Sequence, residues 1–346
     1  MKNKITCLLA GAALFGATAN AEIVLGDSLS AYGYIDMALT DGEGDGNTEF
    51  NDVAEFELGL SFAPAESKWS AVAELSFDSG TDITSTSTSA TAVAQDPVVE
   101  GVPGLSATTG GQVTGAETAT TTASNATDSS AEFEVVTISY QYSDALSFSV
   151  GQMDTYQGFE TADATGLYQF SYAGSSTVND GYMYSALYAV GVSADYSSGD
   201  IDLGVWAGDT DTGTSSFEYY AGYNGVENLS LNVVYADDPG YETVNVWATY
   251  DYGDFTFAVE SVDTENATGG DVLDLTTAMV YYSMGNGGIT LRMTDGDYNG
   301  VDFDKFTVSP SYAFSDNVFG LVEFSSEELG EADDEDSLAV ELIYSF

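Results

Sequence analysis

The stretch SLAVELIYSF, residues Ser337 to Phe346, guides the interpretation of the whole chain. Successive side chains of a β-strand point to opposite faces. Here every second residue from Leu338 to Phe346 is apolar, while Glu341 and Ser345 fall on the other face. Such a strand at the edge of a soluble sheet would promote aggregation. In a transmembrane barrel, the same alternation presents one face to lipid and the other to a polar lumen.

The same alternation recurs along the chain, and the 23 tyrosines, 18 phenylalanines, 37 glycines and 5 prolines are typical of strands joined by tight turns. The weaker segments leave the strand number open between about 14 and 18. We expect about sixteen strands, at residues 29–39, 53–63, 68–78, 132–142, 146–153, 185–196, 201–209, 217–224, 229–236, 243–250, 255–262, 275–284, 289–294, 305–314, 318–325 and 338–346.

The breaks between these strands alternate in length. Breaks such as 64–67 and 285–288 are tight, whereas 40–52, 263–274 and 295–304 are longer and acidic. Short turns on one rim and longer loops on the other are typical of outer-membrane barrels. The sequence therefore predicts an all-β fold, a transmembrane antiparallel up-and-down β-barrel that occupies residues 22–346.

The amino end has the pattern of a secretory signal peptide. Lys2 and Lys4 precede a short apolar run, and Ala19-Asn20-Ala21 fits a cleavage motif. We expect residues 1–21 to be removed, because the apolar run is too short for the alternative, a membrane anchor. The only cysteine, Cys7, lies in this segment, so neither disulfides nor thiolate metal sites are expected in the rest of the chain.

Charge excludes several functions. The net charge is −51, and Lys68, Arg292 and Lys305 are the only basic residues after the predicted signal peptide. Such a surface repels nucleic acid and attracts cations. The chain has no histidine and no nucleophile motif or phosphate-binding loop, so we expect neither an enzyme nor a cofactor.

Residues 79–131 differ in composition from the rest of the chain, since Thr, Ser, Ala and Gly dominate and aromatic residues are almost missing. A segment of this kind cannot bury a core of its own. We predict one long external loop. The alternative, a linker between two domains, would leave three strands as a first domain, which would be unstable alone.

Carboxylates dominate the predicted lumen. On the face of each strand opposite to the apolar series we expect Asp36, Glu55, Glu57, Glu74, Glu134, Asp195, Asp202, Glu218, Glu260, Glu323 and Glu341. Arg292 and Lys305 also fall on polar faces of neighbouring strands. Inward carboxylates raise the local cation concentration, which predicts a preference for cations. The alternative is that these acids only keep the interior wet.

Two acidic segments have the spacing of a calcium-binding loop without flanking helices. In the first, we expect weak Ca²⁺ binding by side-chain oxygens of Asp41, Glu43, Asp45, Asn47, Glu49 and Asp52. The second repeats half of the pattern with Asp295, Asp297, Asn299, Asp302 and Asp304. Chance matches are the alternative in a chain this acidic.

With its strand number, terminal Phe346 and signal peptide, the chain resembles Gram-negative general porins. Three short segments resemble the strand-then-loop stretch of porins of the OmpL-like type: Gly151–Asp154, Gly158–Glu160 and Thr165–Ser171. The resemblance implies a passive outer-membrane channel for ions and small hydrophilic solutes, surrounded by lipid and assembled as a homotrimer. It also implies that one long loop, residues 154–184, folds into the pore.

Charged residues of this loop predict a constriction. Glu160, Asp163 and Asp180 would face Arg292 and Lys305 across the narrowing, with Glu74 also lining the pore. Opposed charges of this kind would create a transverse field that filters solutes. The alternative is that the three acids of the loop lie on an exposed loop tip. The chain departs from the family's basic pore wall, since it has so few basic residues.

Two other classes of protein fit parts of the sequence. A non-conducting surface barrel could act in adhesion or envelope structure, with the Thr- and Ser-rich loop binding a partner. A secreted acidic β-sandwich would instead press its apolar faces against each other.

Overall fold

The computed structural model of the chain describes residues 23–42, 54–83, 125–160, 169–176, 178, 181–184, 188–209, 215–330 and 334–346. The predicted signal peptide and most of the predicted external loop lie outside these ranges. Within the described ranges, no helix is both long enough and apolar enough to cross a membrane.

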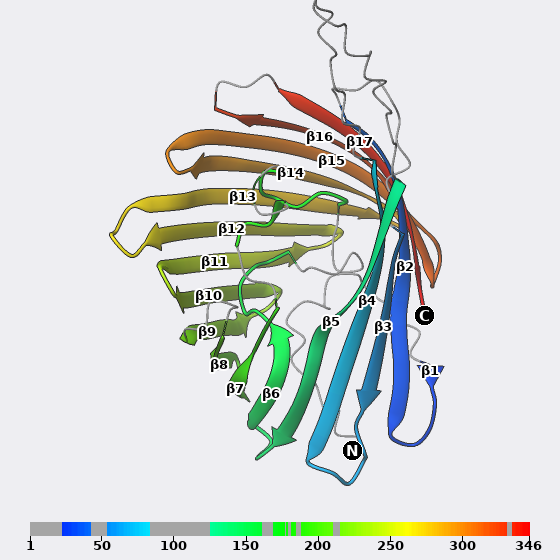
Figure 1. Cartoon of the computed structure of the whole chain (residues 1–346), viewed down its shortest axis with the longest axis vertical. Helices are drawn as coiled ribbons and strands as arrows, with labels where there is room; N and C mark the ends of the chain where they lie inside the picture. The colour runs from blue at the N-terminus through cyan, green and yellow to red at the C-terminus, as the bar shows by residue number, and fades with distance from the viewer. Residues whose placement is uncertain are drawn as a thin grey trace, which may run out of the picture. The chain divides into compact units, whose positions relative to one another are not determined.

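Strands make up most of the described chain (Figure 1). Each strand from β2 onward matches one predicted strand, whereas the short β1 was not predicted. The bounds are β1 Ile23–Val24, β2 Leu29–Gly42, β3 Ala54–Phe62, β4 Trp69–Ile83, β5 Asn125–Gln141, β6 Leu146–Asp154, β7 Tyr188–Ser198, β8 Ile201–Asp209, β9 Ser215–Val226, β10 Leu229–Asp238, β11 Tyr241–Tyr252, β12 Phe255–Asn266, β13 Asp271–Met284, β14 Gly287–Tyr298, β15 Val301–Ser315, β16 Val318–Leu329 and β17 Glu335–Ser345.

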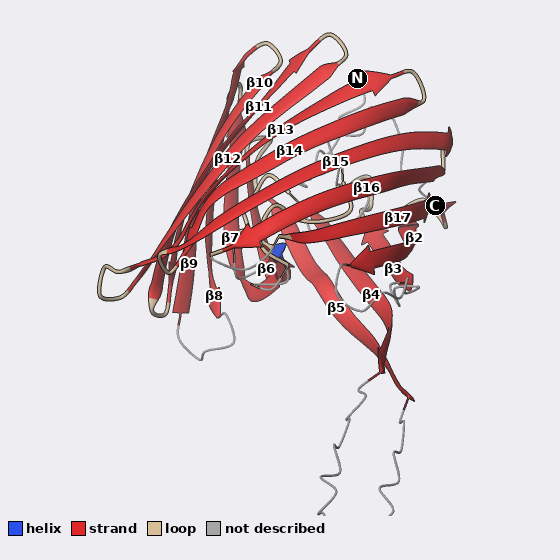
Figure 2. Ribbon diagram, turned by 90° about the horizontal axis from the view of Figure 1, so that it is seen from above, coloured by secondary structure: helices blue, strands red, loops and turns tan. Residues whose placement is uncertain are grey.

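The strands form one antiparallel sheet that closes on itself (Figure 2). From β2 to β17 each strand neighbours the next along the chain, and β17 pairs back with β2, as in the pairing of Ile343 with Asp36. Main-chain hydrogen bonds of 2.9 Å run in both directions between Gly33 and Phe346 and extend this seam. The predicted closed barrel is confirmed, and the alternative of two stacked sheets is wrong.

The side-chain alternation predicted for residues 337–346 is present in β17. Val340 and Leu342 are 43% and 42% exposed, whereas Ala339 and Glu341 are 3% and 6% exposed. Exposed apolar side chains beside buried polar ones reverse the arrangement of a soluble protein. This reversal is what a barrel with lipid outside and a polar interior requires.

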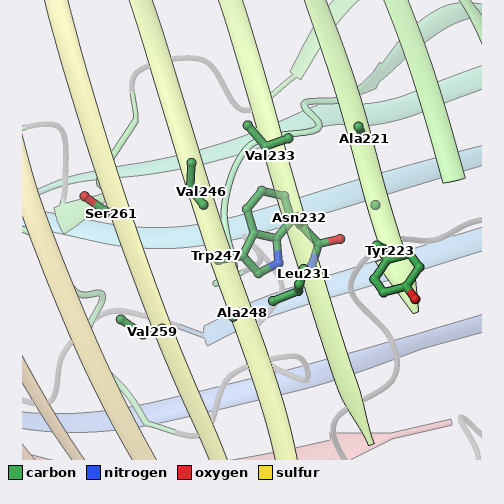
Figure 3. Close-up of a pocket in the computed structure, with 11 residues that line it drawn as sticks. Ala221, Tyr223, Leu231, Asn232, Val233, Val246, Trp247, Ala248, Val259 and Ser261 are labelled. Carbon is green, nitrogen blue, oxygen red and sulfur yellow. The ribbon is translucent and has the colours of Figure 1, made fainter. Parts of the chain in front are cut away.

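A shallow apolar hollow of about 540 Å³ lies across β9 to β12 (Figure 3). Val233, Val246 and Val259 line it and are 41%, 46% and 46% exposed. Ala221 and Ala248 also line it. These side chains belong to the outward apolar band, so the hollow is a feature of the outer surface and not of the lumen.

Several strands extend beyond their predicted ranges. The breaks predicted at 263–274 and 295–304 are mostly strand, because β12 continues to Asn266 and β14 continues to Tyr298. The second connection is a tight turn in which Asn299 adopts a φ of 53°. The expectation of long loops at these two places is therefore wrong. These strand ends are rich in aspartate, so their composition resembles that of a loop.

The chain divides into two compact units, residues 1–79 with 129–346, and residues 80–128. The first unit contains the barrel. Of the second unit, the structure describes the ends of β4 and β5. Both ends of the predicted loop 79–131 are thus strand, up to Ile83 and from Asn125.

Deleting residues 84–124 and joining β4 to β5 through a short Gly-Ser connector is expected to leave barrel assembly intact. The pairings that close the barrel through β17, β2, β3 and β4 lie outside this segment. Heat-modifiable migration in gels would report the folded form. Deletion of β13 is the control that should abolish it, and loss of the folded form in the first variant would contradict the expectation.

Candidate functional site

We call residues 155–184, which follow β6, the inner loop. The structure describes residues 155–160, 169–176, 178 and 181–184 of it. These residues make hydrogen bonds with inward side chains of β9, β11, β14, β15 and β16. Figure 1 shows the green segment after β6 passing in front of the strands around β13. Four anchors fix the described parts.

The first anchor is Glu218 on β9, which is 6% exposed. Its carboxylate accepts hydrogen bonds from Thr155 Oγ1 at 2.6 Å and from the Tyr156 main-chain nitrogen at 2.7 Å. The Tyr156 ring stacks on Tyr220 with 5.5 Å between centroids, and Tyr220 stacks on Trp247 at 6.3 Å. Charge-assisted hydrogen bonds and aromatic packing together fix the start of the inner loop.

The second anchor joins Gly158 to β11 and β12. The Gly158 main-chain nitrogen donates to Asn245 Oδ1 at 2.8 Å, and Asn245 Nδ2 donates to Glu260 Oε1 at 2.7 Å. Gly158 has a φ of +96°, and a Cβ atom there would lie 2.2 Å from the Tyr184 ring. Only glycine fits this position without strain. The Tyr184 hydroxyl donates to the Glu160 carbonyl at 2.6 Å.

The surroundings of Tyr184 favour the protonated form of its hydroxyl. Burial, and after it the negative charge of Glu260, raises the pKa of the Tyr184 hydroxyl well above its ordinary value. The hydroxyl therefore keeps its proton at any physiological pH and stays a donor to Glu160.

The third anchor is a buried ion pair between the inner loop and β14. Arg292 Nη1 lies 2.5 Å from Glu160 Oε1, and the two side chains are 1% and 8% exposed. Arg292 Nη2 donates to the Tyr172 carbonyl at 2.7 Å, and Glu160 Oε2 accepts from the Ala173 main-chain nitrogen at 2.8 Å. Gln169 Nε2 donates to Glu160 Oε1 at 2.5 Å. Removing either charge would leave the other buried and uncompensated.

The fourth anchor is Glu323 on β16, which is 1% exposed. Its carboxylate accepts hydrogen bonds from the main-chain nitrogens of Phe170 at 2.7 Å and Ser171 at 3.1 Å. Ser309 Oγ donates to the same carboxylate at 3.2 Å. The main chain just before Tyr172 is therefore held against β16.

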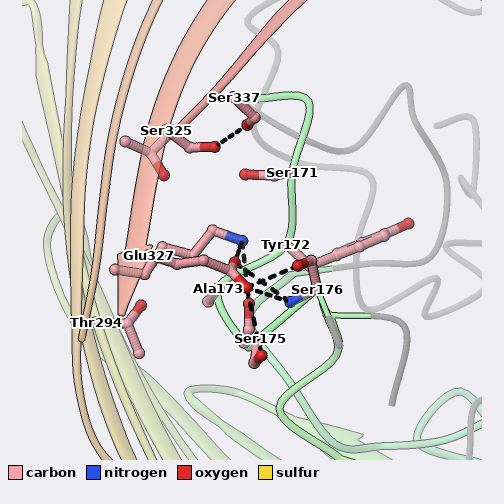
Figure 4. A network of polar contacts seen from close by, with 12 residues as sticks. Ser171, Tyr172, Ala173, Ser175, Ser176, Thr294, Ser325, Glu327 and Ser337 are labelled. Atoms are coloured by element: carbon pink, nitrogen blue, oxygen red, sulfur yellow. Dashed lines mark hydrogen bonds and ion pairs between the residues drawn. The ribbon is translucent and has the colours of Figure 1, made fainter. Parts of the chain in front are cut away.

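A second ion pair lies next to this anchor (Figure 4). Lys305 Nζ is 3.2 Å from Glu327 Oε2 and 3.1 Å from the Gly174 carbonyl. Glu327 also accepts from Ser176 Oγ at 2.7 Å and from the Ser176 main-chain nitrogen at 3.2 Å. Arg292 and Lys305 are 1% and 5% exposed, so both inward cations lie beneath the inner loop with carboxylate partners.

A different surface faces inward from β2, β3, β4 and β17, and we call it the acidic wall. None of these four strands contains lysine or arginine. The Tyr32 hydroxyl donates to Glu74 Oε1 at 2.5 Å, and the Tyr34 hydroxyl donates to Glu55 Oε1 at 2.7 Å. The pairing of Asp36 with Glu55 across β2 and β3 adds a further carboxylate. The wall also includes Glu57 and Glu341, 3% and 6% exposed.

The structure corrects the predicted constriction. Glu160 does not face Arg292 across open water, because the two side chains are in contact and buried. Lys305 is paired with Glu327, which the sequence placed in a loop and not among the site residues. Glu74 lies on the acidic wall. Asp163 and Asp180 lie outside the described residues.

The two predicted calcium segments have different outcomes. Glu43, Asp45, Asn47, Glu49 and Asp52 lie outside the described residues, and only the main chain of Asp41 is described. The second segment is wrong as a long loop, because its four aspartates lie on β14 and β15 and pair across them, Asp295 with Asp304 and Asp297 with Asp302, while Asn299 lies in the tight turn between the strands. Over the described ranges, the carboxylates form no group suited to hold a metal ion.

Sequence reasoning missed three groups that position the inner loop: Tyr156, Asn245 and Glu327. Asn245 and Glu327 are in phase with the inward series of their strands, so the period of two was a usable signal. Nothing in the local sequence of Tyr156 indicates that its ring stacks on β9.

This closed antiparallel barrel has the fold of outer-membrane β-barrels. A loop-deletion mutant of OmpT, an outer membrane protein of Vibrio cholerae, is similar with a TM-score of 0.62 and 12% identity, over 92% of this chain and 99% of that one. In-vitro folded OmpT of the same organism has a TM-score of 0.59 and 12% identity, over 94% and 100%. A triple mutant of the Rhodopseudomonas blastica porin has a TM-score of 0.57 and 17% identity, over 92% and 100%.

Sequence comparisons add no family to this likeness. No protein-family model and no curated protein matches the chain. At identities of 12% and 17% the similarity to solved structures shows the fold alone. The resemblance to the OmpL-like type gains no support from these comparisons.

Proposed function

We propose that the chain is an outer-membrane porin, a passive channel for ions and small hydrophilic solutes that prefers cations. A porin from Rhodopseudomonas blastica has the same fold, and the outward apolar side chains fit a lipid surrounding. We infer no catalytic step. Homotrimeric assembly, and weak Ca²⁺ binding by residues 41–52, belong to the proposal.

One observation carries the proposed selectivity. Arg292 and Lys305 are buried with carboxylate partners, while the acidic wall contains no basic residue. A solute beside this wall meets negative charge without a compensating free cation. Cations would therefore concentrate in the passage and anions would be repelled. This selectivity needs no transverse field across a constriction.

Purified protein in planar bilayers is expected to show a reversal potential in a KCl gradient that corresponds to several-fold K⁺ over Cl⁻ permeability. The double variant Glu55→Gln with Glu74→Gln should lower this ratio, because it removes two wall charges and keeps acceptors for Tyr34 and Tyr32. The matched control is Glu66→Gln, which removes an exposed charge in the turn between β3 and β4.

Anion preference, or a ratio that the double variant does not change, would refute the role of the acidic wall. A barrel that inserts but carries no current would refute the channel itself. That result would favour the alternative proposed from the sequence, a non-conducting surface barrel in adhesion or envelope structure.

A further inference from the structure

Two tyrosine rings of the inner loop form a compact aromatic surface. The Tyr172 and Tyr182 ring centroids are 4.0 Å apart, and Tyr184 lies 6.3 Å from Tyr182. Tyr172 and Tyr182 are partly exposed. In Figure 4 the Tyr172 side chain extends away from Glu327 on β16. The structure thus presents a pair of ring faces on the side of the inner loop away from that strand.

The position of this pair is fixed and not left to loop motion. Arg292 Nη2 donates a hydrogen bond to the Tyr172 carbonyl at 2.7 Å. The Glu323 carboxylate accepts hydrogen bonds from the main-chain nitrogens of Phe170 and Ser171, the two residues before Tyr172. Because the anchoring groups are buried, the rings are pre-organised before any solute arrives, which lowers the entropic cost of binding.

The acidic wall gives the same passage a negative charge. Burial above all raises the pKa of the Tyr172 hydroxyl, the neighbouring Tyr182 adds to this, and the charge of Glu55 contributes further. The hydrogen bonds from Tyr34 to Glu55 and from Tyr32 to Glu74 hold both carboxylates in place.

This combination selects one class of ligand. Aromatic faces attract organic ammonium groups through the ring quadrupole, and a desolvated contact is stronger than an exposed one. Inorganic cations are better served by convergent carboxylates, and the described residues offer no such group. Anions would find no free basic side chain, because Arg292 and Lys305 are paired.

We propose that organic ammonium ions bind in the passage against the ring pair of Tyr172 and Tyr182, drawn there by the negative charge of the acidic wall. The proposal rests on the proposed function, since it assigns a solute class to the same passage. The carboxylates supply charge attraction that every cation shares, and the rings supply the preference for ammonium groups that carry carbon.

Choline and its neutral isostere 3,3-dimethylbutanol distinguish charge from shape without any variant. Added to the full-length protein conducting KCl, choline is expected to interrupt the current in a concentration-dependent manner, whereas the isostere should not. Replacing both Tyr172 and Tyr182 with leucine should raise the half-blocking choline concentration about three- to thirtyfold. Replacing both with phenylalanine keeps the rings and should change it by less than about threefold.

Tyr281→Leu is the matched control, because Tyr281 lies on β13 above Gly288 and outside the proposed site. Equal block by choline and the isostere, or unchanged block in the double leucine variant, would overturn the proposal. If the barrel carries no KCl current, saturation-transfer NMR on detergent-solubilised protein still tests whether choline binds. Binding that is lost in the double leucine variant would support the proposed site, and no binding to the unchanged protein would overturn it. Failure of the site and failure of the channel are thereby separate results.

Discussion

Replacing Arg292 with methionine is expected to release the inner loop and to produce the largest change in conductance of any single variant. Methionine keeps most of the side-chain volume but leaves the Glu160 carboxylate buried without its partner, which costs about 3–5 kcal/mol. The hydrogen bond to the Tyr172 carbonyl is lost as well. We expect a larger single-channel conductance with frequent current steps, and a lower midpoint of unfolding.

Lys68→Met is the matched control, because this substitution also removes a positive charge, but Lys68 lies exposed, donates to the Tyr142 carbonyl at 2.8 Å and is outside the inner loop. A second variant separates charge from packing. Adding Glu160→Gln to Arg292→Met removes both buried charges and should restore part of the lost stability. Wild-type conductance and an unchanged unfolding midpoint in Arg292→Met would show that the ion pair does not hold the inner loop.

Gly33→Val is expected to prevent closure of the barrel. A Cβ atom at residue 33 would lie 2.1 Å from the main-chain oxygen of Glu57, and 3.1 Å from the Phe346 ring. Because the closest atom belongs to the backbone of β3, relief requires a shift of the strand itself. Gly33 also exchanges both main-chain hydrogen bonds with Phe346 at the seam. Overpacking alone costs about 1–3 kcal/mol, and loss of seam hydrogen bonds adds to it.

The measurement is the yield of the heat-modifiable folded form after refolding into detergent. Gly26→Val is the matched control, since a Cβ atom at Gly26 would meet nothing within 4 Å. A normal yield for Gly33→Val, equal to that of the control, would mean that β2 and β3 can separate at this point without loss of the barrel.

Much of the fold could be predicted from the sequence because the side-chain period of a strand is a local property. Leu338, Val340 and Leu342 share one face as soon as the strand forms, and closure of the barrel turns that face outward. Strand ends were less predictable. Asp263 and Asp295 lie in strands that continue beyond the apolar band, and a strand with polar side chains on both faces has no compositional mark that separates it from a loop.

Within the candidate site, the sequence placed Arg292 and Lys305 on inward faces, which the structure shows as buried positions on β14 and β15. The carboxylate partners of Arg292 and Lys305 could not be predicted from the sequence. Glu160 is 132 residues from Arg292 in the chain, and the predicted constriction placed a gap between them. Glu327 was not predicted as a site residue, because it lies in an acidic stretch that was interpreted as a loop.

The sequence by itself determined the alternation of apolar and polar faces, the order of the strands and the scarcity of positive charge, because these follow from residue identity and the geometry of one extended chain. Only the tertiary structure decided that both inward cations are neutralised under the inner loop and that tyrosines and carboxylates share the remaining wall. Such pairings depend on where closure of the barrel brings distant segments, and no local pattern encodes that distance.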